Sequence, residues 1–156
     1  MLTLAKTDGM AVVYEPDTDV ILVDIIGRLE LPDAMLITES MSSFVTDIVA
    51  ARRPYYVLLD LRRATGASPA SRKFFANVPE HQRPLVVGRR LVFISSSFAM
   101  QTLAKLTMKA LALAKLFTVR DDDWLADKWA LKADEAGARA WIRECQRSDR
   151  ERAGKT

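Results

Sequence analysis

The chain has 156 residues, of which 49% are hydrophobic and 28% are charged, and its formal net charge is +3. This length predicts one domain with its own core, and the composition excludes a disordered or fibrous protein. A single cysteine, Cys145, excludes an internal disulfide, and a single histidine, His81, argues against a zinc site or a histidine-dependent nucleophile.

The positive excess is concentrated near the end of the chain, in residues 139–156. Because the rest of the chain is nearly neutral, we expect no nucleic-acid partner. The start of the chain lacks the pattern of a secretory signal, and no apolar run reaches the roughly 18 residues of a membrane span. These features predict a cytoplasmic protein.

The first elements of the chain are a hairpin and a helix. Residues 1–10 have no clear period and predict a loose arm or a short edge element. Segments 11–15 and 20–28 are rich in β-forming residues, and the Pro-Asp-Thr-Asp turn between them predicts a hairpin. Apolar residues then recur at helical spacing over 31–53, which predicts a long amphipathic helix.

The apolar run at 55–61 predicts a buried central strand that ends near Asp60. A polar loop follows, and Ser68 with Pro69 directly behind it predicts the start of a helix over 69–78. Ligands tend to bind where such strands end, at the carboxyl edge of the sheet. This edge is therefore the first place in which we expect a functional site.

The second half of the chain continues the alternation of strands and helices. It predicts a strand at 90–95, a helix at 98–117, an acidic loop at 121–127, an edge strand at 128–132, a helix at 134–147 and a flexible basic tail at 148–156. The order β-β-α-β-α-β-α-β-α predicts a single α/β domain over residues 1–156. Its sheet is expected to be mixed and mostly parallel, with about five strands and about four helices.

This order, together with the strand sequence Tyr-Val-Leu-Leu-Asp-Leu at 56–61, resembles the STAS domain family, also called SpoIIAA-like, over roughly residues 11–147. Members are typically non-enzymatic switch modules, in which a partner kinase phosphorylates a serine or threonine at the start of the helix after the central strand. The resemblance implies an equivalent segment at 65–71. It points to Thr65, Ser68 and Ser71 as regulatory or partner-binding residues and matches Asp60 to the strand-end aspartate of the family.

A phosphate on Ser68 would lie at a helix N-terminus, with Arg62 and Arg63 nearby in the sequence. The alternative is that Ser68 is a plain N-cap. Phosphorylated members resemble Asp-Ser-Ser-Gly, whereas this chain has Ser-Pro-Ala-Ser at 68–71 and lacks both the acidic residue and the glycine. It looks closer to a group of bacterial SpoIIAA-like proteins whose fold resembles the lipid-binding CRAL-TRIO domains.

The residues predict no catalytic site, no metal site and no cofactor. Asp60 is a single carboxylate without a visible partner, and the serine run at 95–97 lacks the Gly-x-Ser-x-Gly pattern of a nucleophile elbow, so we interpret it as a helix cap. The acidic residues at 121–127 lack the spacing and the glycine of a calcium-binding loop. An enzyme is therefore the weakest hypothesis.

The helix expected at 98–117 carries more apolar residues than one sheet face needs. Four residues widen its apolar side or lie among its lysines: Met100, Met108, Leu111 and Leu116. They predict an apolar interface with a second subunit, a lipid or a membrane surface, and the alternative is a core helix with its lysines in water.

The leading hypothesis is a non-catalytic STAS-like module that binds a protein partner or forms a homodimer. The alternative is a carrier or sensor for an apolar or lipid-like ligand, which requires a cavity beneath the helix at 98–117. A partner-binding module should have a filled core and an exposed apolar patch, whereas a carrier should have a roomy apolar pocket.

Overall fold

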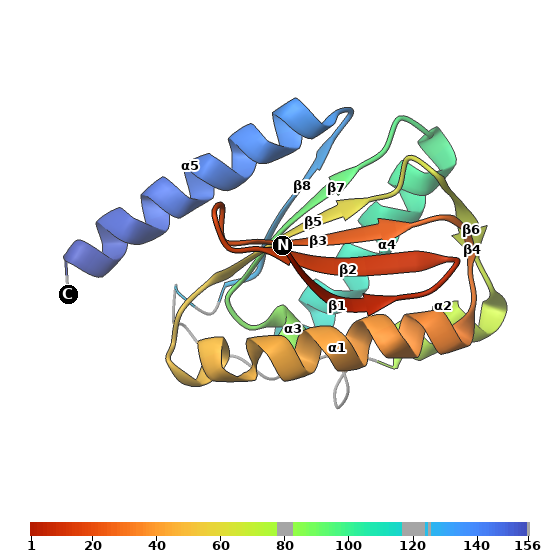
Figure 1. Cartoon of the computed structure of the whole chain (residues 1–156), viewed down its shortest axis with the longest axis horizontal. Helices are drawn as coiled ribbons and strands as arrows, with labels where there is room; N and C mark the ends of the chain where they lie inside the picture. The colour runs from red at the N-terminus through yellow and green to blue at the C-terminus, as the bar shows by residue number, and fades with distance from the viewer. Residues whose placement is uncertain (78–82, 117–123, 125, 156) are drawn as a thin grey trace.

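The structure is a computed structural model that describes residues 1–77, 83–116, 124 and 126–155, except for the side chains at 83, 103, 107 and 110–116. The described residues form a mixed α/β fold in which helices cover both faces of one large sheet (Figure 1). His81 and the acidic residues 121–123 lie outside the described residues. None of the helices in the described part of the chain is both long and apolar enough to cross a bilayer.

The large sheet has six strands in the order β1-β2-β3-β5-β7-β8. β1, β2 and β3 pair antiparallel, and the pairs from β3 onward are parallel. The strands are β1 (Leu2–Lys6), β2 (Met10–Glu15), β3 (Val20–Ile25), β5 (Tyr55–Asp60), β7 (Arg89–Ile94) and β8 (Lys128–Lys132). The predicted mixed, mostly parallel α/β fold is confirmed. β5 and β7 lie inside the sheet and are covered on both faces, which explains their nearly continuous apolar sequences.

Helices pack on the two faces of the sheet and form two separate cores. α1 (Leu31–Ala50), α2 (Pro69–Ala76), α3 (Arg83–Val86) and α4 (Phe98–Leu116) contribute to the core on one face. α5 (Glu135–Gly154) builds the core on the other face, with Ala138, Ile142 and Cys145 against the sheet. Figure 1 shows the 20-residue helices α1 and α5 on opposite sides of the strands.

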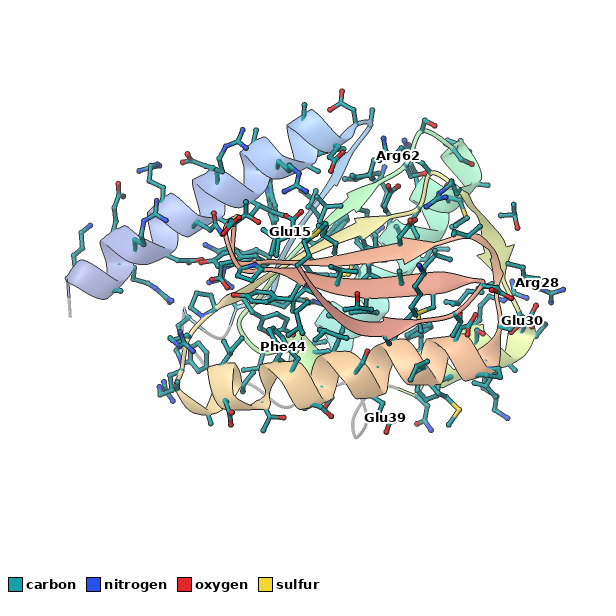
Figure 2. All side chains as sticks on the ribbon, in the orientation of Figure 1. Glu15, Arg28, Glu30, Glu39, Phe44 and Arg62 are labelled. Atoms are coloured by element: carbon teal, nitrogen blue, oxygen red, sulfur yellow. The ribbon has the colours of Figure 1, made fainter. Side chains whose placement is uncertain are left out.

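Side chains from the hairpin of β2 and β3 contact both α1 and α5. Phe44 of α1 points toward the sheet (Figure 2), and its ring lies 4.7 Å from that of Tyr14 between their centroids. On the other side, Arg139 of α5 donates from Nη1 to Glu15 Oε1 at 2.9 Å. The turn that joins β2 to β3 therefore lies against α5.

The structure decides two expectations about the ends of the chain. Of the two alternatives for residues 1–10, a loose arm or a short edge element, residues 2–6 form the edge element, because they pair with β2 as β1. The tail expected to be flexible from residue 148 is helical as far as Gly154. It stays helical because Asp149 is buried against the sheet, where its carboxylate accepts hydrogen bonds from Arg90 and Tyr56.

A second, two-stranded sheet replaces part of the expected polar loop. β4 (Gly27–Leu29) and β6 (Ala64–Ala67) pair parallel to each other beyond the ends of β3 and β5. Gly27 has a φ of +73°, a backbone conformation that glycine adopts without strain, and it lets the chain leave β3 and enter β4. The Ser68 amide then donates to the Leu29 carbonyl, so this small sheet fixes where α2 begins.

Candidate functional site

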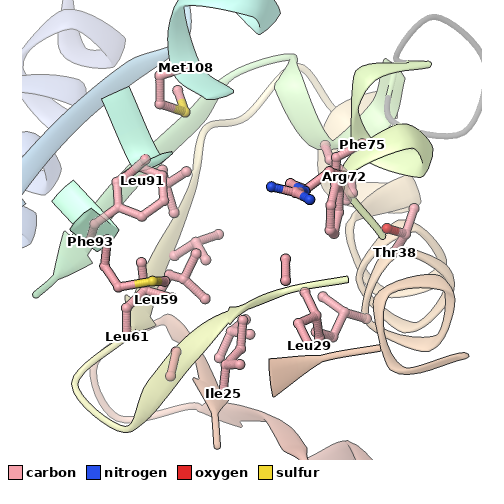
Figure 3. A pocket seen from close by; sticks show the side chains of 18 of the residues that line it. Ile25, Leu29, Thr38, Leu59, Leu61, Arg72, Phe75, Leu91, Phe93 and Met108 are labelled. Atoms are coloured by element: carbon pink, nitrogen blue, oxygen red, sulfur yellow. The ribbon is translucent and has the colours of Figure 1, made fainter. Parts of the chain in front are cut away.

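An apolar pocket of about 360 Å³ lies between the sheet and helices α1, α2 and α4 (Figure 3). Strand residues such as Leu59, Leu91 and Phe93 line it, and α4 contributes the buried residues Met100, Ala104 and Met108. Its volume is within the range of about 300–1,000 Å³ that is usual for small-molecule sites.

Small side chains explain why this space is not filled. β6 lines the pocket with Ala64, Gly66 and Ala67, and Ala104 lies between the two methionines of α4. Where the facing side chains are this short, the sheet and the helices cannot interdigitate as they do in a densely packed core. Exposed residues Arg72, Ala76 and Leu106 also line the pocket, so its mouth lies between α2 and α4.

The position of α4 corrects the predicted apolar interface. Met100 and Met108 are buried and line the pocket, so they are not surface residues. They recur every four residues with Ala104 and form the side of α4 that faces the sheet, whereas Leu106 is 60% exposed. The side chains of Leu111 and Leu116 lie outside the described part of the chain.

Among the described residues, three polar ones line the otherwise apolar pocket, namely Thr38, Arg72 and Arg89. Arg89 is buried, and its Nε and Nη2 donate to the two carboxylate oxygens of Asp127 at 3.1 and 2.9 Å. Burial opposes the charged form of Arg89, but the carboxylate of Asp127 outweighs it and raises the pKa of Arg89. The charge of Arg89 is therefore already balanced within the protein.

Thr38 and Arg72 have no such partners in the part of the chain that the structure describes. The Thr38 side chain is buried, and its hydroxyl makes no hydrogen bond in the described part of the chain. The guanidinium of Arg72 likewise has no hydrogen-bond or ion-pair partner among the described residues, and it points into the pocket (Figure 3). No acidic residue is present among the described residues that line the pocket.

Two ion pairs of described residues lie at the carboxyl edge of the sheet. Asp60 accepts from Arg62 Nε at 3.0 Å and from Nη2 at 2.7 Å, and Arg63 pairs with Asp24. Burial opposes ionisation of Asp60, but the hydrogen bonds from Arg62 outweigh it and hold the pKa of Asp60 below its ordinary value. Asp60 is therefore an ionised partner of Arg62 at neutral pH, which does not favour a role as a proton donor.

The residues suggested by the STAS resemblance lie at the start of α2. Ser68 is the N-cap predicted from the sequence, and its Oγ accepts from the Ser71 amide at 3.1 Å. The Ser71 hydroxyl donates to the Leu29 carbonyl at 3.0 Å, and both serines are buried. Thr65, in contrast, is exposed on β6. A kinase cannot reach Ser68 or Ser71 in this conformation, and phosphorylation of these residues stays an untested prediction.

The predicted edge residues Asp60, Arg62 and Arg63 come together at the end of β5 but do not line the pocket. Their sequence neighbours Leu59, Leu61 and Ala64 do line it. Among the described residues, no group of three or more His, Cys, Asp or Glu side chains could hold a metal ion. The small side chains of β6 are the feature of the sequence that relates to the pocket. They could not be interpreted in this way from the sequence, because the interpretation requires that β6 lies beside α4.

A search of solved structures finds the same fold in another protein. It is an uncharacterized protein of the DUF3478 family with a SpoIIAA-like fold, from Shewanella loihica PV-4. The match has a TM-score of 0.56 and covers 88% of this chain and 97% of that chain, with 18% sequence identity. The chain has a SpoIIAA-like fold. The resemblance to STAS domains is confirmed at the level of the fold. No protein-family model matches the chain, and no curated protein matches it significantly.

Proposed function

We propose that this SpoIIAA-like domain is a non-catalytic module that binds a small apolar ligand in the pocket under α4. The observation that carries the proposal is the pocket itself, because a module built only for docking partners is expected to have a filled core. The ion pair between Asp60 and Arg62 supports binding over catalysis, since it occupies the carboxylate at the sheet edge. The SpoIIAA-like fold, typical of non-enzymatic modules, is consistent with this function.

The volume sets the size of the ligand. A cavity of about 150 Å³ accommodates benzene, so 360 Å³ is large enough for a longer molecule, such as an eight-carbon chain. Burying eight carbons contributes at most about 6 kcal/mol, which corresponds to a dissociation constant on the order of tens of micromolar. Octanol is therefore a suitable neutral probe, and its binding is measurable by isothermal titration calorimetry.

The test compares two alanines on the same helix. Ala104 lines the pocket and Ala99 is exposed on α4, so Ala104→Leu fills the pocket while Ala99→Leu adds the same carbons in water. We expect octanol to bind the wild type and Ala99→Leu equally, and to bind Ala104→Leu at least about tenfold more weakly. Equal binding to all three proteins, or no binding to the wild type, contradicts the proposal.

Docking of a protein partner or a second copy of the chain is the second candidate function. Phe98 is 83% exposed and Leu106 is 60% exposed, both on α4, and exposed large apolar residues are favoured at interfaces. Native mass spectrometry tests this candidate and the ligand proposal together. A dimer that Phe98→Ser converts to a monomer would support docking. A monomer that carries an apolar molecule would favour the pocket.

A further inference from the structure

The apolar pocket is lined by a positive charge and a hydroxyl that make no hydrogen bond or ion pair with the described residues. Arg89 is neutralised by Asp127, so Arg72 supplies the unbalanced charge among the described lining residues. Figure 3 shows Arg72 of α2 with its guanidinium directed into the pocket and Thr38 of α1 beside α2 at the same end. A ligand that fits these features has one polar end here and an apolar remainder.

The Thr38 hydroxyl is the more informative of the two groups. Its side chain is 4% exposed, and within the described residues its oxygen has no hydrogen-bond partner. A buried polar atom in this state destabilises a protein, and such atoms are uncommon in native structures. Because Thr38 lines the pocket, a bound ligand can accept the hydrogen bond that this hydroxyl has to donate.

We propose that Arg72 and Thr38 form a subsite for the carboxylate of an amphiphilic acid whose hydrocarbon chain lies in the apolar pocket. A guanidinium donates two parallel hydrogen bonds to a carboxylate, and the threonine hydroxyl adds one more. One unbalanced cation matches the single charge of a carboxylate better than the double charge of a phosphate monoester. This assignment rests on the proposed function and specifies the chemical class of the ligand.

Three eight-carbon probes distinguish binding of the head group at the subsite from binding of the hydrocarbon chain in the pocket. Octanoate, octanol and octyl phosphate each contain eight carbons and carry different head groups, and calorimetry measures their affinities for the wild-type protein. We expect octanoate to bind about 10- to 100-fold more tightly than octanol, because its head group makes charge-assisted hydrogen bonds. Tighter binding of octyl phosphate than of octanoate would overturn the assignment to a carboxylate.

Variants then locate the preference for the acid. Arg72→Gln should reduce the preference for octanoate over octanol to near one. Lys73→Gln is the matched control, because it removes the same charge from the neighbouring exposed position on α2 and should leave the preference intact. A preference that survives Arg72→Gln, or that falls equally in Lys73→Gln, refutes the subsite.

Thr38→Val distinguishes a hydroxyl that binds the ligand from one that stabilises the fold. It removes the unpartnered hydroxyl but keeps the shape, so it should raise the melting temperature of the ligand-free protein by roughly 2–10 °C. The same variant should weaken octanoate binding by about 2- to 10-fold. A lower melting temperature would show that the hydroxyl has a structural role and would remove Thr38 from the subsite.

If octanol and octanoate both bind and the acid is not preferred, the proposed function stands and only the carboxylate subsite fails. If neither molecule binds, the ligand-binding function itself fails. The two results are distinguishable in one set of titrations.

Discussion

Breaking the buried ion pair between α5 and the sheet is expected to destabilise the protein strongly, and a single substitution tests this. Arg90 is 0% exposed, and its Nε and Nη2 donate to the carboxylate of Asp149 at 3.1 and 3.0 Å. The Tyr56 hydroxyl donates to the same carboxylate at 2.9 Å, and burial followed by the charge of Asp149 raises the pKa of this phenol, so it remains a donor. Asp149→Asn leaves the guanidinium buried without a counter-charge.

The expected loss from Asp149→Asn is about 3–5 kcal/mol of unfolding free energy, because an uncompensated buried charge is strongly unfavourable. For a chain of this length, this loss lowers the melting temperature by about 6–20 °C, which circular dichroism records directly. Arg147→Gln on the same helix is the control, since Arg147 pairs with glutamates in solvent and its loss should change stability by less than about 1 kcal/mol. If Asp149→Asn unfolds at the same temperature as Arg147→Gln, the ion pair of Asp149 with Arg90 does not stabilise the packing of α5 on the sheet.

The remaining predictions concern packing, pH and the backbone. Ala104→Leu should be neutral or stabilise the protein by up to about 2 kcal/mol in urea unfolding, since it fills space, whereas a dense core would lose about 1–3 kcal/mol. The hydrogen bond from Arg139 holds the pKa of Glu15 below its ordinary value. The contribution of this ion pair to stability is therefore present above about pH 4.3 and is lost as the pH falls. Wild-type melting temperature should therefore fall more steeply than that of Glu15→Gln below this pH, and parallel curves would contradict this. Gly88→Ala should lower the melting temperature, because φ is +69° and the added Cβ would lie 3.0 Å from a tryptophan ring; an unchanged value would show that the ring moves aside.

Features that depend on neighbouring residues were predictable from the sequence. The central strand at 55–60, the Ser68 cap and the Asp134 cap of the last helix all follow from local patterns, and the structure has each of them. The alternation of these elements also gave the fold class, because parallel strands need helical connections. The core strands and the helix N-termini are each determined by residues that are close together in the sequence.

Features that join distant residues were not predictable. Arg90 and Asp149 are 59 residues apart, and nothing in either segment marks the other as its partner. Met100 and Met108 were predicted at an interface but are buried, because alanine and leucine occur around most of α4 and the weak apolar period does not indicate its buried side. β4 and β6 are too short for a period, and their pairing depends on where the large sheet ends.

The start of α2 connects the segment marked by the STAS resemblance to the pocket. Ser71 is hydrogen-bonded to the Leu29 carbonyl, and the next residue, Arg72, directs its guanidinium into the pocket that Leu29 also lines. The buried serine hydroxyls therefore hold one wall of the pocket in place. In this chain, the segment at 65–71 is part of the structure that shapes the pocket, so its missing phosphorylation motif and the presence of the pocket are consistent with each other.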